Sequence, residues 1–308
     1  MTAGSIDDDS PGATWVPGLE QVGPESLPEM QAILSQCLAH PDDRYTVHPG
    51  DLAWWLHHSF GTDWVDTTWV IPGEAVLSLE ENDGEINLFA RSSQTRMGLI
   101  EWAQHRLGHK AEVGWVADDD TELVSYLKGA GYEPAGVYRS YLWNLSNTPI
   151  PGPSLPIGWT LRHLGGEHEA DGRRHAAHAA FESTMEPDVH LERYLRFMRS
   201  PVYVPERDLV AVSPEGMIAA FMVWWADDDT GIAQIEPFGT HPDFQRLGIG
   251  RALIYFGLGR MREAGMTATR VCTNEPRDAV HFYEDVGFDD VGRLRWWKPP
   301  GNAIPDLQ

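Results

Sequence analysis

The chain has 308 residues, about twice the roughly 150 of a typical domain, so two domains of similar size are expected. Its hydrophobic fraction of 42% is that of an ordinary globular protein, and its longest apolar run, residues 218–225, is too short to cross a bilayer. The formal net charge of −23 argues against nucleic-acid and membrane partners. It would attract a cationic partner or substrate, and the alternative is that the acidic surface only keeps the protein soluble.

The amino terminus and the cysteines indicate a cytoplasmic protein. Residues 1–12 are small, polar and acidic, without the basic start and apolar core of a secretion signal, and they predict a disordered tail. Cys37 and Cys272 fall in different halves of the chain, which argues against a disulfide framework and fits a reducing compartment.

The first half, residues 13–150, is predicted to be one α/β domain. Hydrophobic periodicity and turn residues predict helices near 28–39, 50–58, 98–108 and 121–130, and strands near 67–91 and 111–116. The segment 147–158, NTPIPGPSLPIG, is rich in proline and glycine and is predicted to be a linker.

The second half, residues 158–308, repeats this outline. Strands are expected at 159–164, 207–213, 216–225, 232–240, 268–274 and 292–298, and helices at 169–182, 190–198, 248–264 and 276–286. Residues 126–139 align with 282–295, so that Gly131 corresponds to Gly287. The chain is therefore predicted to hold two copies of one fold, each a mixed α/β sheet with helices on its faces.

The sequence GTHPDFQRLGIGRALI, which begins at Gly239, places two glycines between a strand and a helix. Unpaired N–H groups at a helix start attract anions, and glycine lets a ligand approach the backbone. A phosphate or pyrophosphate is the expected ligand, with Arg246 and Arg251 adding positive charge. The motif alone is weak, and a loop that needs two glycines for its own conformation is the alternative.

With a second motif downstream, the sequence resembles the GNAT acyltransferase superfamily. That family carries R/Q-x-x-G-x-G/A after a strand, supplied here by Gln245, Gly248 and Gly250. It then carries A-x-x-x-Y-x-x-x-G-F, supplied by Ala279, Tyr283, Gly287 and Phe288. The resemblance covers residues 158 to about 298 and implies a tandem, two-domain member with splayed, mostly antiparallel sheets, in an architecture like that of mycothiol synthase.

The resemblance also implies acetyl-CoA as cosubstrate and the residues that would bind it. The backbone of the strand end would contact the pantetheine arm, and the loop N–H groups would hold the pyrophosphate. The implied residues are Phe238, Gly239, Thr240, Gln245, Arg246, Leu247, Gly248, Ile249, Gly250, Arg251, Asn274 and Phe282. An asparagine common in the family three residues before the motif alanine is replaced here by Pro276.

Acyl transfer to an amine needs a base, an oxyanion donor and an acid for the leaving thiolate. Glu236 lies within an apolar strand beside the expected acyl group and is predicted to be the base, a buried ion pair being the alternative. The resemblance implies that Tyr283 is the acid, and packing of its ring is the alternative. Cys272 is expected to be a core thiol, so direct transfer without a covalent enzyme intermediate is predicted.

The expected acceptor is the primary amine of a small, cationic molecule. In the family the first two helices of the domain and nearby loops select the acceptor, and the candidates here are Glu182, Glu186, Asp188, His190 and Trp224. No metal is expected, because the pairs His105/His109 and His175/His178 lack a third ligand.

The first half lacks the motif residues. Residues 90–104 contain one glycine, Gly98, and Leu127 stands where the second half has Tyr283, so a degenerate, non-catalytic domain is predicted. The predicted function is N-acetyl transfer by a monomer or homodimer. A non-catalytic acyl-CoA-binding or interaction protein, a longer acyl donor and a peptide amine remain as alternatives.

Overall fold

The computed structural model describes residues 16–39, 47–60, 67–80, 85–274 and 278–300. The predicted tail, residues 1–12, and Pro276 lie outside these ranges. The contacts divide the chain into two compact units. The first unit comprises Met1–Val47, Val65–Val137 and Arg293–Gln308, and the second comprises His48–Trp64 and Tyr138–Gly292. The segment 147–158 lies within the second unit, and the domain boundaries expected from the sequence stay a prediction.

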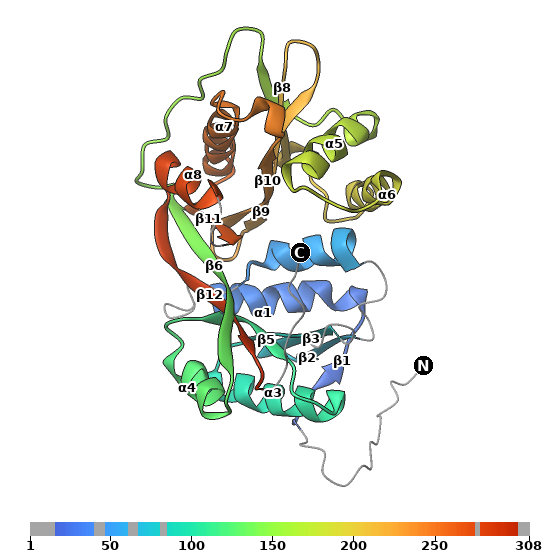
Figure 1. The fold of residues 1–308 in the computed structure, drawn as a ribbon, viewed down its shortest axis with the longest axis vertical. Helices are drawn as coiled ribbons and strands as arrows, with labels where there is room; N and C mark the ends of the chain where they lie inside the picture. Colours follow the sequence, from blue (N-terminus) through green and yellow to red (C-terminus); the bar gives the residue numbers. More distant parts are fainter. Residues whose placement is uncertain (1–15, 40–46, 61–66, 81–84, 275–277, 301–308) are drawn as a thin grey trace. The chain divides into compact units, whose positions relative to one another are not determined.

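The first unit is a sheet with a helical cover (Figure 1). Its strand order is β1-β2-β3-β4-β5-β12, in which β4 and β5 are parallel and the other pairs are antiparallel. The strands are β1 (Glu20–Gln21), β2 (Thr68–Ile71), β3 (Ala75–Glu80), β4 (Glu85–Ala90), β5 (Glu112–Ala117) and the end of β12 (Asp289–Lys298), and the helices are α1 (Leu27–Ala39), α3 (Ser93–Leu107) and α4 (Thr121–Gly129).

Helix α3 begins five residues before the predicted start at 98. The Ser92 side chain accepts a hydrogen bond from the Thr95 N–H at 3.1 Å, which caps the helix at its first turn. The first turn of α3 is polar, so the apolar pattern in the sequence begins later than the helix and does not reveal this cap.

The second unit has the strand order β6-β11-β10-β9-β8-β7. Only β10 and β11 are parallel, and the remaining pairs are antiparallel. The strands are β6 (Glu133–Asn144), β7 (Thr160–His163), β8 (Asp208–Val212), β9 (Ile218–Asp227), β10 (Ile232–Thr240) and β11 (Ala268–Asn274). Strand β6 was not predicted, and its residues from Tyr138 onward complete this sheet by pairing with β11.

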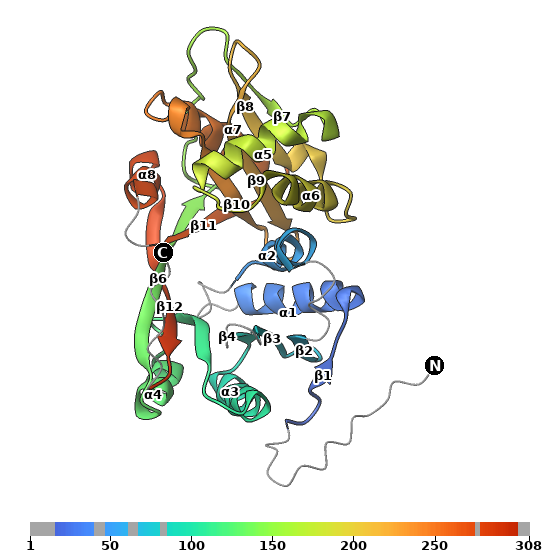
Figure 2. The same ribbon diagram turned by 45° about the vertical axis from the view of Figure 1, so that its right-hand side comes forward.

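Helices cover both faces of this sheet (Figures 1 and 2). On β9, the Phe221 ring contacts Arg173 of α5. The next residue, Met222, packs against α7, because a Cβ added to Gly257 of that helix would lie 2.5 Å from the Met222 sulfur. Neighbouring side chains of a strand point to opposite faces, so α5 and α7 lie on opposite sides. The helices are α2 (Pro49–Trp54), α5 (Ala170–Ala180), α6 (Pro187–Met198), α7 (Ile249–Glu263) and α8 (Asp278–Val286).

The aligned glycines adopt matching backbone conformations in the two halves. Gly131 follows α4 with φ of +84°, and Gly287 follows α8 with φ of +110°, values that favour glycine at a helix end. The predicted fold class, a mixed α/β sheet flanked by helices, is confirmed. Across the described ranges, none of the helices has the length and apolar character that a membrane span requires.

Candidate active site

Strands β10 and β11 separate in the middle of the second unit's sheet. Their pairing begins at Ile232↔Ala268 and runs only to Gln234↔Arg270. Beyond that point β10 continues on β9, with Phe238 opposite Met222, and β11 continues on β6. The register of β10 shifts between Ile235 and Phe238, where Pro237 has no N–H to offer the ladder. The predicted splay therefore lies at Glu236.

The glycine loop opens helix α7 beside this splay. Gly248 is the N-cap residue with φ of +81°, and a Cβ added there would meet nothing within 4 Å. Glycine is therefore favoured at position 248 by the backbone conformation, and the space around it is open. The first backbone hydrogen bond of the helix is donated by the Ala252 N–H to the Gly248 carbonyl. The N–H groups of residues 249–251 come before this bond, at the start of the helix. An exposed loop of this geometry fits an anionic group.

The other residues of the loop motif hold the loop to β10. A Cβ on Gly250 would lie 2.7 Å from the Thr240 hydroxyl, so this glycine allows the helix to approach the strand. The Gln245 side chain donates to the Thr240 carbonyl at 3.3 Å and ties the loop to the strand end. Phe238 stacks on Phe282 of α8, with ring centroids 5.5 Å apart. Of the remaining expected donor-site residues, Arg246, Leu247 and Arg251 are exposed, whereas Gly239, Ile249 and Asn274 are buried or partly buried.

Glu236 lies at the splay and is partly buried. Its backbone carbonyl accepts a hydrogen bond from the Trp225 indole N–H at 2.8 Å. Burial, and then the negative charge of Asp51, raises the pKa of Glu236 to about 8. A carboxyl group with a pKa in this range can take up and release a proton near neutral pH.

Sequence reasoning missed Asp51 and His48. The Asp51 carboxylate accepts the His48 backbone N–H at 2.9 Å, and the His48 ring accepts the Gly50 N–H at Nδ1. The proton of the neutral ring is then on Nε2, which donates to the Ile232 carbonyl at 3.0 Å. Burial lowers the pKa of His48 to about 3 and raises that of Asp51 to about 7. The signal in the sequence, His48-Pro-Gly-Asp51, is that of a helix cap and nothing more specific.

Tyr283 lies on α8 near Glu236 and Cys272. Its ring centroid is 5.6 Å from that of Tyr141 and 6.4 Å from that of Phe238. Burial, followed by the charge of Glu236, raises the pKa of Tyr283 far above its usual range, so the phenol keeps its proton. Burial also raises the pKa of the Cys272 thiol, which makes it a poor nucleophile.

The expected acceptor residues lie in two different environments. Glu182, Glu186 and Asp188 are exposed around the start of α6. His190 of α6 is buried, with its Nδ1 atom 3.4 Å from that of His178, and burial lowers its pKa to about 4.

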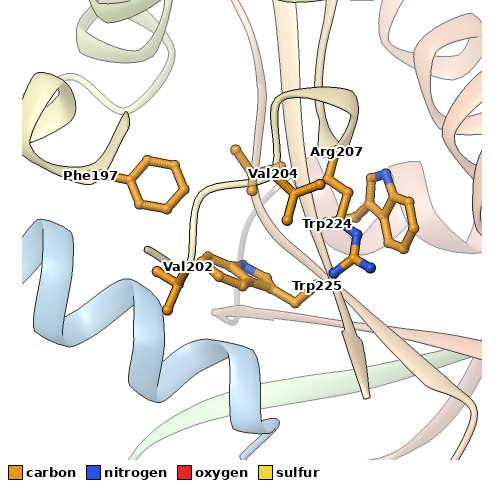
Figure 3. A pocket seen from close by; sticks show the side chains of 7 residues that line it. Phe197, Val202, Val204, Arg207, Trp224 and Trp225 are labelled. Atoms are coloured by element: carbon orange, nitrogen blue, oxygen red, sulfur yellow. The ribbon is translucent and has the colours of Figure 1, made fainter. Parts of the chain in front are cut away.

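Trp224 belongs to the core beside α7 and lines a small pocket (Figure 3). The Arg207 guanidinium lies 4.7 Å from the Trp224 ring centre, and Phe197 and Trp225 also line the pocket. The cavity volume of about 10 Å³ has room for a single water molecule. This pocket is too small for an amine substrate, and the role of Trp224 stays a prediction.

The first unit has no comparable loop in its described residues. The start of α3 is capped by the Ser92 side chain. In its first turn, the Arg96 guanidinium lies 2.6 Å from a carboxylate oxygen of Asp120. Leu127 is fully buried in the core of this unit. Across the residues that the structure describes, no three His, Cys, Asp or Glu side chains are grouped so as to hold a metal ion.

Comparisons with known proteins agree with this geometry. Residues 174–288 match the family model described as the acetyltransferase (GNAT) family. A mycothiol acetyltransferase of Thermomonospora curvata is 26% identical over 175 residues, which are 56% of this chain and 59% of that protein. One of Nocardiopsis dassonvillei is 25% identical over 227 residues, 68% of this chain and 67% of that protein. The match to the first of these relatives thus spans less than two thirds of its length.

Solved structures agree on the fold. The tandem GNAT protein from the clavulanic acid biosynthesis pathway has a TM-score of 0.62 at 13% identity, over 93% of this chain and 100% of that chain. At this identity the likeness concerns the fold alone, and it extends over both units. Residues 174–288 thus match the acetyltransferase (GNAT) family model, and the fold over both units is similar to that of a tandem GNAT protein.

Proposed function

We propose that the protein is an N-acetyltransferase that transfers the acetyl group of acetyl-CoA to the primary amine of a small, cationic molecule. The observation that carries this proposal is the position of Glu236, a carboxyl group with a pKa of about 8 at the splay between β10 and β11. The buried phenol of Tyr283 lies beside it, so a proton acceptor and a proton donor flank one place in the fold.

The loop before α7 fits the donor. The N–H groups of residues 249–251 and the side chains of Arg246 and Arg251 would hold the pyrophosphate, since they combine an exposed helix start with positive charge. The end of β10, Phe238 to Thr240, would hold the pantetheine arm. Acetyl-CoA supplies the acetyl group as a thioester.

The side chains provide the proton transfers. Glu236 in its ionised form takes a proton from the acceptor ammonium and leaves a neutral amine that can attack the thioester carbonyl. Tyr283 donates its proton to the departing sulfur and regains one from the amine nitrogen or from solvent. Cys272, with its raised thiol pKa, takes no covalent part, so transfer is direct.

Charge supports a cationic acceptor. The chain carries a net charge of −23, and Glu182, Glu186 and Asp188 are exposed near the start of α6. Relatives named mycothiol acetyltransferase support a small-molecule acceptor rather than a peptide. The first unit is proposed to be non-catalytic, because Ser92 already caps the helix start at which a second donor would bind.

Calorimetric titration of the full chain with acetyl-CoA, followed by a screen of amines for thiol release, tests the proposal. We expect one donor site per chain and turnover that is lost in Glu236→Gln while donor binding is kept. Donor binding without turnover on any amine would instead identify an acyl-CoA-binding protein. Absence of donor binding would overturn the role of the loop.

A further inference from the structure

The segment 48–60 carries α2, belongs to the second unit, and is held to it by hydrogen bonds at both ends. At its start, the His48 ring donates to the Ile232 carbonyl of β10. At its end, the Arg196 side chain of α6 donates to the carbonyls of His57 and His58, at 3.0 and 2.8 Å. These contacts hold the segment on the sheet that carries Glu236.

Helix α2 also lies directly on the strand next to Glu236. A Cβ on Gly50 would come within 2.3 Å of the Trp225 side chain, so only glycine allows this approach. The same Trp225 donates its indole N–H to the Glu236 carbonyl. Gly50, which precedes Asp51, is therefore separated from the backbone of the proposed base by the Trp225 side chain.

The Asp51 carboxyl interacts with charges on both separated strands. It raises the proton affinity of Glu236 on β10 and that of Cys272 on β11, and it is itself influenced by Arg270 of β11. Asp51 therefore lies within the range of charge interaction with both strands where they part. The other titratable and charged groups around Asp51 and Glu236 are His48 on the segment 48–60, Arg270 and Cys272 on β11, and Tyr283 on α8.

We infer that Asp51 is a positioning residue for Glu236: its carboxyl group, brought to the splay by the segment 48–60, sets the protonation state of the proposed base. The inference rests on the proposed function, because it concerns the same site. Two adjacent carboxyl groups in a low-dielectric place resist holding two negative charges, so one proton is retained by the pair.

The helix cap that Asp51 also forms provides a way to separate the two roles. In Asp51→Asn the side-chain oxygen can still accept the His48 N–H, but the negative charge is gone. In Asp51→Glu the charge is kept. Asp171→Asn, which removes an exposed carboxylate of the second unit that pairs with Arg174, is the matched control.

The direct readout is the ¹³C carboxyl resonance of Glu236 in the full chain, identified by its loss in Glu236→Gln. In Asp51→Asn we expect the titration midpoint of Glu236 to fall by at least about one pH unit, because a like charge has been removed. Asp51→Glu should stay closer to the wild type than Asp51→Asn does, and Asp171→Asn should match the wild type. An equal midpoint in Asp51→Asn and wild type would overturn the inference and leave Asp51 as a cap only.

The second readout is the pH profile of turnover with an accepted amine. Its rising limb should move to lower pH in Asp51→Asn by the same amount as the resonance, and an unmoved limb would count against the inference. Failure of the proposed function is seen separately, as no turnover with any amine. The Glu236 resonance still titrates in that case and still tests Asp51.

Discussion

Glu236→Gln should make the free energy of unfolding of the protein less sensitive to alkaline pH. The pKa of Glu236 is 4.5 in its ordinary state and about 8 in the fold, raised first by burial and then by Asp51. Because the folded value is the higher one, the unfolded chain loses this proton first. The free energy of unfolding therefore falls as the pH rises from the unfolded to the folded value.

The size of the effect follows from the two pKa values. Between about pH 5.5 and about pH 8.5 the wild type should lose about 3 kcal/mol of unfolding free energy through this one group, since one pKa unit corresponds to about 1.4 kcal/mol. Glu236→Gln removes this loss. Any packing effect of the amide is the same at both pH values and cancels in the difference.

Urea unfolding at the two pH values measures this difference. We expect the stability of Glu236→Gln relative to wild type to rise by about 3 kcal/mol from the lower to the higher pH. Glu263→Gln, which changes an exposed glutamate of α7 paired with Arg260, should show no such change. If the relative stability of Glu236→Gln changed by less than about 1 kcal/mol between the two pH values, the reasoning that the fold raises the pKa of this carboxyl group would be refuted.

Three further predictions concern the surrounding contacts. Gly250→Ala should destabilise the protein by about 1–2 kcal/mol because its Cβ meets the Thr240 hydroxyl, and Thr240→Ala should relieve that loss in a double-mutant cycle; additive effects in urea unfolding would contradict the contact. Tyr283→Phe should lower kcat about 100-fold while calorimetry shows unchanged acetyl-CoA affinity, and an unchanged kcat would remove the proposed acid. Asp208→Ala should cost about 3–5 kcal/mol, seen in thermal unfolding, because it leaves the buried Arg173 without its counter-charge at 3.7 Å; a loss below about 1 kcal/mol would show that the pair contributes little.

Local chemistry explains why the motif region could be read from the sequence. The bounds of β10 and β11 agree with the predicted strands, and α7 begins at Ile249 beside the expected start. Gly248 adopts a backbone conformation that glycine favours, and the helix that follows it has a continuous apolar pattern. Such features depend on neighbours within a few residues, so they appear in the sequence itself.

The glycine pair also shows a limit of that reading. The sequence suggested that both glycines serve the approach of a ligand. The structure separates them: Gly248 has open space and a positive φ, while Gly250 is needed for packing against Thr240. Which atoms surround an added Cβ depends on the strand beside the helix, and this is not visible in a local motif.

The sequence by itself determined the family resemblance, the strand that carries Glu236, and the helix that carries Tyr283. Only the tertiary structure decided that Asp51 joins Glu236. Asp51 stands in an ordinary helix-cap pattern. It comes near β10 because the His48 ring donates a hydrogen bond to the Ile232 carbonyl and because Gly50 packs against the Trp225 side chain. The pKa of a carboxyl group depends on burial and on charges within a few ångströms, and these neighbours come from distant parts of the chain.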